Sequence, residues 1–290
     1  MRPLALCLLA GSVALAAEIG PLPLWKGTPP GDTGQLGPEY DSNTAKDPLI
    51  AGRPILRITN VSVPTLTVYP AAGAEARPAI VVFPGGGYHI LALDLEGTEV
   101  CQWLNAAGVT CVLVKYRVPA RPGRPPYAAP LQDAQRAVGM VRAHAKEWGI
   151  DPQRIGVLGF SAGAHLAAAL GTSFEKRTYE RVDDADDASC RPDFAILIYP
   201  GLLARDGKLG SEVAPVAGTP PTFLVQAEDD PVRVENSLAY YAALKAVKVP
   251  VEMHLYSEGG HGYGLRPTAL AVTTWPARAT DWLRSTGVLK

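Results

Sequence analysis

The most informative stretch of the chain reads IGVLGFSAG over residues 155–163. Its first six residues form a short apolar run, which is typical of a strand buried in a parallel sheet. Small residues follow from Ala162 to Leu170 and favour a helix. Ser161 therefore lies on a sharp strand-to-helix turn, where Gly159 and Gly163 leave room for close backbone packing and the serine hydroxyl is pushed clear. The N–H groups and the positive dipole end of the following helix point toward that hydroxyl.

The pentapeptide alone is a weak signal, because a Gly-x-Ser-x-Gly pattern arises by chance in about one such chain in ten. A purely structural strand-to-helix turn is the alternative interpretation. The apolar strand before the serine, the helix after it and the partner residues described below favour a functional one.

Strands and helices alternate on either side of this turn. Strands are predicted at 57–61 and 65–69, as a first pair broken at Pro64, and then at 79–83, 110–116, 155–160, 194–199, 221–227 and 251–256. Helices are predicted at 96–107, 130–148, 162–170, 234–247 and 275–285. This alternation specifies an α/β fold with a mostly parallel central sheet and helices on both faces.

The N-terminal residues differ in character from this domain. Arg2 precedes an apolar run from Leu4 to Ala17 that ends in small residues, which predicts a signal peptide over 1–17 with cleavage after Ala16 or Ala17. Residues 18–53 are rich in Pro and Gly and are predicted to form an extended arm laid over the domain. Residues 54–290 are predicted to form a single catalytic domain. We therefore expect a secreted or periplasmic protein with no stable membrane insertion.

Composition excludes several classes of protein. The 27 Lys and Arg residues against 28 Asp and Glu residues give a net charge of −1, which argues against nucleic acid as a partner. Four cysteines are too few for a disulfide-stapled scaffold. Cys101 and Cys111 are predicted to be buried thiols in preference to a disulfide. The charged segment 176–192 is predicted to be a solvated surface loop.

A serine hydroxyl needs a base to become a nucleophile. Of the five histidines, His261 is the candidate, because it lies in the loop GGHGYG (259–264) directly after the last apolar strand. A carboxylate must fix the tautomer of that base. Asp229 and Asp230 both follow the strand 221–227, and spacing alone does not choose between them.

An acyl-transfer reaction also needs N–H donors for the oxyanion that develops. The run PGGGY (84–88) follows the strand 79–83, and its glycines leave the backbone amides bare. The predicted donors are Gly86 or Gly87 together with Ala162. A phosphate-binding loop is disfavoured because no Gly-Lys-Ser/Thr follows.

Four stretches together resemble the α/β-hydrolase family across nearly all of the mature length. They are PGGGY (84–88), GFSAG (159–163), AEDDPVRVE (227–235) and GGHGYG (259–264). The likeness is strongest to secreted esterases related to acetyl-xylan esterases and to the hormone-sensitive-lipase group. It implies the α/β-hydrolase fold, and its pattern A-E-x-D-P-L-R-x-E places the acid at Asp230, with Asp229 as the alternative. The family usually carries His before the glycine run, where this chain has Pro84.

The resemblance implies a serine carboxylic-ester hydrolase for short acyl esters, including acetyl groups on a plant polysaccharide such as xylan. No cofactor or metal is expected, and the partner is a small-molecule or polysaccharide ester. Tyr88 and Tyr263 border the predicted site as candidate sugar-stacking residues, with a packing role as the equal alternative. Residues 115–117 and 133–136 are interpreted as an ion-pair network at the sheet edge, and Glu96 receives no role. The alternatives are a peptidase of the prolyl-oligopeptidase type and a catalytically silent binding protein of the same fold.

Overall fold

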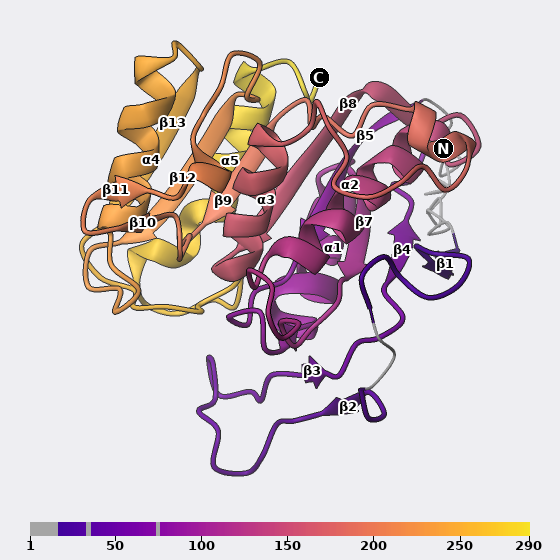
Figure 1. Cartoon of the computed structure of the whole chain (residues 1–290). Helices are drawn as coiled ribbons and strands as arrows, with labels where there is room; N and C mark the ends of the chain where they lie inside the picture. The colour runs from indigo at the N-terminus through magenta and orange to yellow at the C-terminus, as the bar shows by residue number, and fades with distance from the viewer. Residues whose placement is uncertain (1–16, 33–35, 74–75) are drawn as a thin grey trace, which may run out of the picture.

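The computed structural model describes residues 17–32, 36–73 and 76–290 and contains an eight-stranded sheet (Figure 1). The strand order is β1-β4-β7-β5-β8-β9-β12-β13. From β7 to β13 neighbouring strands run parallel, whereas β4 pairs antiparallel with both β1 and β7. The bounds are Ile19–Pro23 (β1), Thr65–Tyr69 (β4), Arg77–Phe83 (β5), Thr110–Lys115 (β7), Ile150–Phe160 (β8), Ala195–Ile198 (β9), Thr222–Ala227 (β12) and Val251–Tyr256 (β13). The predicted mostly parallel sheet is confirmed.

Helices cover both faces of this sheet because its central strands are apolar on both sides. In β5, for example, Ile80 and Val82 join the core cluster on one face, and Val81 and Phe83 join the cluster on the other. The first face is covered by α1 (Glu99–Ala106) and α5 (Trp275–Ser285), and the second by α2 (Ala128–Ala143), α3 (Ala162–Thr172) and α4 (Glu235–Ala246).

A small three-stranded antiparallel sheet lies beside the main one, toward the bottom of the view in Figure 1. It consists of β2 (Tyr40–Asp41), β3 (Arg57–Thr59) and β6 (Leu91–Ala92). The predicted pairing of residues 57–61 with 65–69 is therefore wrong. The chain turns at Asn60, which has a φ of 58°, so β3 joins the small sheet while β4 joins the large one.

The predicted arm, residues 18–53, contributes β1 to the edge of the large sheet and β2 to the small one. Trp25 anchors it, being only 6% exposed and donating from Nε1 to Asp133 at 2.8 Å. The guanidinium carbons of Arg117 and Arg136 lie 5.9 and 6.0 Å from the Trp25 ring centroid. The arm is thus packed into the domain, and the boundary at residue 53 stays a prediction.

The predicted signal peptide lies almost entirely outside the described residues, since the structure describes nothing before residue 17. Its existence and its cleavage site stay predictions. Across the described part of the chain, no helix has both the length and the apolar character that crossing a membrane requires.

Cys101 on α1 and Cys111 on β7 form a disulfide, which corrects the prediction of two free buried thiols. The connection from α1 to β7 is short, so α1 packs against β7 and the two cysteine Cα atoms lie 5.1 Å apart. Such a distance suits a disulfide. Cys190 is free and buried.

The charged segment 176–192 is not simply a solvated loop, which corrects a second prediction. The Asp186 side chain is only 1% exposed and lies 3.0 Å from Arg136 on α2 and 3.5 Å from Arg177. The segment folds onto α2 because the acids near its middle neutralise the buried guanidinium of Arg136.

The predicted ion-pair network at the sheet edge is confirmed. Arg117 and Asp133 are both 0% exposed, and their charged groups approach to 3.0 Å. Both oxygens of Asp133 also accept from the Arg117 Nε, at 3.0 Å. Lys115 binds Glu39 of the arm at 2.7 Å.

We expect Asp133→Ala to lower the free energy of unfolding by about 3–5 kcal/mol, because it leaves the Arg117 charge buried without a counter-ion. The exposed Asp281, which pairs with Arg284 at 3.5 Å, provides the matched control. Asp281→Ala should change stability by less than about 0.5 kcal/mol. Urea unfolding monitored by tryptophan fluorescence measures both, and equal effects of the two substitutions would contradict the prediction.

Candidate active site

Ser161 lies at the junction of β8 and α3, as predicted, with φ 51° and ψ −116°. This backbone conformation is rare for a residue with a side chain and marks a strained turn. The flanking glycines make the turn possible. A Cβ added at Gly159 would lie 2.1 Å from the Gly163 oxygen, and one at Gly163 would lie 2.1 Å from the Phe83 oxygen.

A continuous hydrogen-bonded chain runs from Ser161 through His261 to Asp230. The Ser161 Oγ is 2.8 Å from the His261 Nε2, and the His261 Nδ1 is 2.8 Å from the Asp230 Oδ2. The Asp230 side chain is 0% exposed, whereas that of His261 is 22% exposed. Three segments separated by up to 100 residues in the sequence therefore meet at one point.

The surroundings of Asp230 hold its carboxylate in place. Its Oδ1 accepts from the Val232 N–H at 2.7 Å, and its Oδ2 also accepts from the Gln226 side chain at 2.7 Å. Gln226 is fixed in turn by a hydrogen bond from Ser237 at 2.8 Å. These donors fix the orientation of the Asp230 carboxylate toward the His261 ring.

Asp229, the alternative acid, is exposed and lies away from the imidazole. Its Oδ1 accepts from the Gly260 N–H at 2.8 Å, so it braces the loop that carries His261. The structure thus brings Asp230, and not Asp229, into contact with the His261 ring.

The glycine run at 85–87 passes directly beside the serine turn. A Cβ at Gly85 would lie 3.0 Å from the Ser161 Cβ and 2.6 Å from the Phe160 oxygen, so only glycine fits there. No described residue accepts a hydrogen bond from the amides of Gly86, Gly87 or Ala162. The role of these N–H groups as oxyanion donors stays a prediction.

The other histidines do not reach Ser161. His89 is exposed, His144 lies against Glu147, and His254 binds Glu252 on its own strand. His165, one helical turn after Ser161, is 2% exposed. Its Nδ1 is 2.8 Å from the Tyr88 hydroxyl and its Nε2 is 3.3 Å from Glu212.

Tyr88 and Tyr263 do not offer open stacking faces, which corrects their prediction as sugar-stacking residues. They are only 1% and 5% exposed. Tyr88 is turned inward because its hydroxyl bonds to His165, and Tyr263 packs edge-on against Tyr199 at 4.5 Å between centroids. Tyr127, at the start of α2, is half-buried and lines the hollow described below.

Glu96 is a functional candidate to which sequence reasoning assigned no role. It is 4% exposed, accepts from the Gly85 N–H at 2.6 Å and accepts from the Tyr199 hydroxyl at 2.8 Å. Burial raises the pKa of Glu96, and the hydrogen bonds from Tyr199 and Gly85 partly offset this. The stretch 90–101 carries three acids, Asp94, Glu96 and Glu99, and nothing in the sequence separates Glu96 from the other two.

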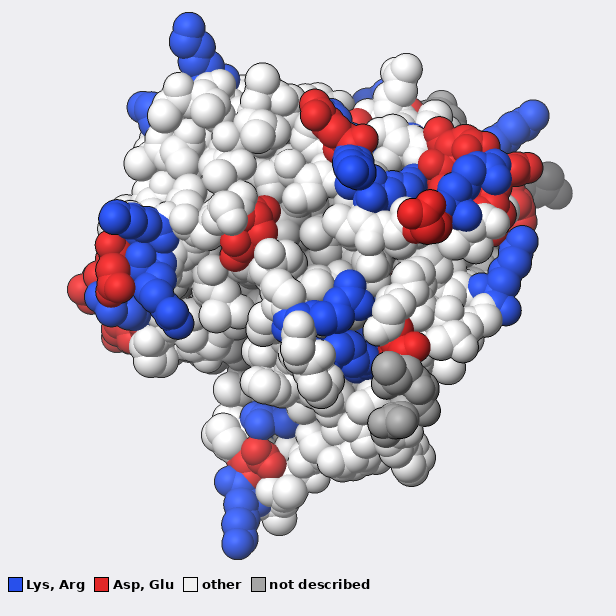
Figure 2. Space-filling view, viewed as in Figure 1, with Lys and Arg blue, Asp and Glu red and all other residues white. Residues whose placement is uncertain are grey.

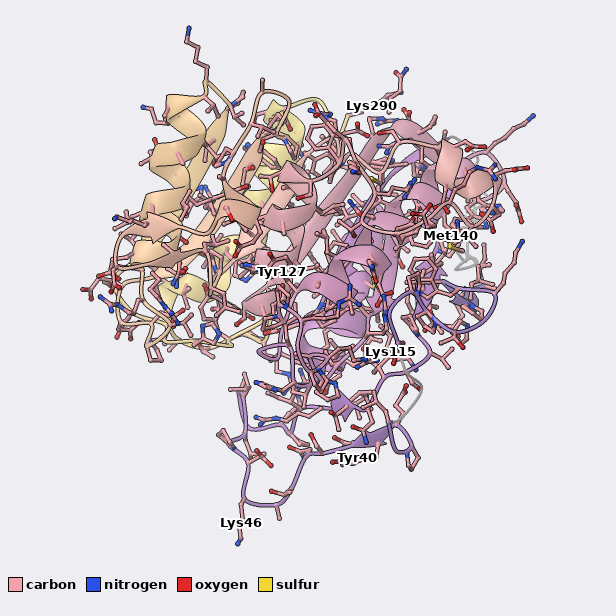
Figure 3. All side chains as sticks on the ribbon, in the orientation of Figure 1. Tyr40, Lys46, Lys115, Tyr127, Met140 and Lys290 are labelled. Atoms are coloured by element: carbon pink, nitrogen blue, oxygen red, sulfur yellow. A yellow bond between two sulfur atoms is a disulfide. The ribbon has the colours of Figure 1, made fainter. Side chains whose placement is uncertain are left out.

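A hollow of about 620 Å³ lies near the serine turn, and its lining includes Tyr88, which follows the glycine loop, and His165, one helical turn after Ser161. It is bounded by Tyr88, Tyr127, His165 and a short hairpin formed by β10 (Ala204–Arg205) and β11 (Lys208–Leu209). Figure 1 shows this hairpin at the left edge of the molecule, and Figure 3 labels Tyr127 near the centre of the same view.

Comparison with known proteins agrees with this geometry. A family model described as the alpha/beta hydrolase fold matches residues 80–214 and 206–265. An acetylxylan esterase of Xylanibacter ruminicola is 32% identical over 213 residues, which are 64% of this chain and 41% of that protein. A carboxylesterase of Mycobacterium tuberculosis is 27% identical, covering 69% of this chain and 71% of that protein.

A solved structure is similar over nearly the full length. The acetyl ester-xyloside bifunctional hydrolase of Caldicellulosiruptor lactoaceticus is 33% identical and superimposes with a TM-score of 0.73, covering 97% of this chain and 100% of that one. The chain spans less than half the length of the acetylxylan esterase that it matches. With the matched family model, the sheet order and the strand-to-helix serine turn, the chain belongs to the α/β-hydrolase fold family.

Proposed function

We propose that the protein is a serine carboxylic-ester hydrolase. The observation that carries this proposal is the chain of two 2.8 Å contacts from Ser161 through His261 to Asp230. In this arrangement the imidazole accepts the serine proton and Asp230 stabilises the imidazolium that forms. No described residue accepts a hydrogen bond from the amides of Gly86, Gly87 or Ala162, which supports an oxyanion site at Gly86 or Gly87 and Ala162.

The reaction proceeds in two halves. The Ser161 oxygen attacks the acyl carbon while its proton passes to the His261 Nε2, and the intermediate collapses as that proton is given to the departing alcohol oxygen. Water then attacks the acyl-enzyme, losing a proton to the same nitrogen, and the acid leaves as Ser161 regains its proton. These steps need no group beyond the residues named.

We infer short acyl esters as the substrate class, with acetyl groups on xylan or a similar polysaccharide as the specific expectation. Two similar proteins, an acetylxylan esterase and an acetyl ester-xyloside bifunctional hydrolase, support this choice. A peptidase or a silent binding protein of the same fold is disfavoured, because the relatives are esterases and the complete Ser–His–Asp chain is present.

We also infer export of the protein. The leader-like sequence at 1–17 supports this. The disulfide between Cys101 and Cys111 supports it independently, because disulfides persist in oxidising compartments.

Replacing the nucleophile is the first test. We expect Ser161→Ala to lower kcat/KM for p-nitrophenyl acetate by about a thousandfold or more, because no other hydroxyl can form the acyl-enzyme. Thermal unfolding of the variant confirms that it is folded. Full activity in a folded Ser161→Ala protein would refute the proposal.

The two neighbouring acids give a matched pair. We expect Asp230→Asn to lower kcat by about a hundredfold or more, because the amide no longer fixes the imidazole tautomer. Asp229→Asn should cost less than about fivefold, because its carboxylate only holds the Gly260 amide at the surface. Steady-state kinetics on p-nitrophenyl acetate compare the two, and the reverse ranking would contradict the assignment.

A further inference from the structure

The hairpin of β10 and β11 forms one wall of a pocket beside the serine. The pocket has a volume of about 620 Å³. Its walls include Arg205, Lys208 and Glu212 on the hairpin side and Tyr127 on the opposite side. An acetyl group has only two carbons, so the pocket is far larger than the acyl part of the proposed substrate. It is within the usual size range of small-ligand sites, about 300–1,000 Å³.

Several residues that line the pocket are close neighbours of the reacting atoms. Tyr88 in its wall directly follows Gly87 of the oxyanion loop, and His165 lies one helical turn after Ser161. Leu202, also in the wall, follows Gly201, where an added Cβ would lie 4.0 Å from the Ser161 Oγ. The pocket therefore lies beside the serine turn, on the side of Gly201 and Tyr88.

The charges in the pocket balance. Arg205 and Lys208 supply two positive charges, and Asp206 and Glu212 supply two negative ones. Figure 2 shows blue and red atoms gathered together at the left edge, where Figure 1 places β10 and β11. Balanced charge gives no net attraction for an anion or a cation. A wall with several charged groups also disfavours a long alkyl chain, which would desolvate them without a hydrogen bond in return.

Two features remain that suit a ring carrying hydroxyl groups. The half-buried ring of Tyr127 offers an apolar surface at the pocket, and the charged side chains are strong donors and acceptors. The Glu212 carboxylate lies 3.3 Å from the Nε2 of the buried His165, and the Nδ1 of His165 contacts the Tyr88 hydroxyl. The acceptor is thereby positioned before a ligand arrives.

We infer that this hairpin pocket binds a neutral sugar ring, the alcohol part of the ester, with Tyr127 and Lys208 as specificity-determining residues. This inference rests on the proposed ester hydrolysis at Ser161. It assigns the hairpin the selection of polyhydroxylated alcohols over alkyl alcohols.

The test compares a sugar ester with an ester that lacks the sugar. The measured quantity is kcat/KM for acetylated xylotriose divided by kcat/KM for p-nitrophenyl acetate. We expect Tyr127→Ala and Lys208→Ala each to lower this ratio, and Tyr127→Ala to lower it by about tenfold. Most of the change should appear as a higher KM for the sugar ester, because binding is lost in ground and transition states alike. Tyr40→Ala and Lys46→Ala, at exposed positions far from the pocket in Figure 3, should leave the ratio unchanged.

Three outcomes would overturn the inference. The ratio could stay constant in both pocket variants, the Tyr40 control could shift it equally, or Tyr127→Ala could selectively impair methyl ferulate, which would make the pocket an acyl site. Calorimetric binding of xylotriose to the Ser161→Ala protein, with and without Tyr127→Ala, tests the pocket apart from catalysis. If the protein hydrolyses no ester but still binds xylotriose in a way that depends on Tyr127, only the proposed function is refuted. If xylotriose does not bind, the inference about the pocket is refuted.

A different set of contacts assigns a role to Glu96. Its carboxylate joins the Gly85 amide of the oxyanion loop to the Tyr199 hydroxyl after β9. That hydroxyl also accepts from the Gly264 N–H at 3.2 Å, and the Tyr199 ring packs edge-on against the His261 ring at 4.9 Å. One buried carboxylate therefore connects the loop that carries the oxyanion donors with the loop that carries the base.

The geometry points to Glu96 as a positioning residue for the oxyanion loop. Gly85 immediately precedes Gly86, so an anchored Gly85 amide fixes the direction in which the next two amides point. Donors aimed in advance at the developing oxyanion lower the barrier without reorganising during the reaction.

We expect Glu96→Gln to lower kcat for p-nitrophenyl acetate by about tenfold or more with little change in KM, because the oxyanion forms only in the transition state. A glutamine cannot accept from both Gly85 and Tyr199. Tyr199→Phe, which keeps the Gly85 contact, should have a smaller effect on kcat and provides a second variant if Glu96→Gln does not fold. A raised KM with unchanged kcat in either variant, or a larger loss in Tyr199→Phe, would overturn this assignment.

Discussion

The parallel pairing of β5 with β8 is the constraint on which the site depends. Its register places Val82 opposite Leu158 and Phe83 opposite Gly159, so both strands end at the same level. The chain leaves β5 as the glycine loop and leaves β8 as the serine turn, and parallel strands present these ends on one edge of the sheet. The approach of Gly163 to the Phe83 oxygen shows how closely the two connections pack. A side chain at Gly159 or Gly163 would push the serine turn away from the glycine loop.

Charge is used differently in the two halves of the molecule. Around α2, Arg136 pairs with Asp183 and Asp186 of the segment 176–192, and Arg117 pairs with Asp133. The same three side chains on and beside α2 also bind the N-terminal segment, through Trp25, Pro30 and Leu24. Around the site, the buried acids Glu96 and Asp230 instead accept hydrogen bonds, Glu96 from Gly85 and Tyr199 and Asp230 from Gln226 and Val232. The first arrangement pairs opposite charges, whereas the second fixes two carboxyl groups by neutral hydrogen-bond donors.

Local sequence patterns predicted the central sheet and the main site because these depend on short-range signals. The apolar runs at 79–83 and 155–160 match β5 and the end of β8, and the glycine-flanked Ser161 and His261 lie in contact as expected. The errors concern long-range pairing. The partners of β3 and the inward rotation of Tyr88 depend on segments that are distant in the sequence. Cys101 and Cys111 are only ten residues apart, but their pairing depends on how α1 packs against β7. Glu96 escaped assignment for the same reason, since its partners Gly85 and Tyr199 come from two other segments.

The central claim is that Ser161 is a nucleophile activated by His261. Reaction with an organophosphate such as paraoxon, followed by peptide mass spectrometry, tests it most directly, because the adduct marks the attacking atom. The account predicts a single phosphorylated residue, Ser161, formed at least about a hundredfold more slowly in a His261→Ala protein. An adduct on another residue, or an unchanged rate of labelling without the imidazole, would contradict it.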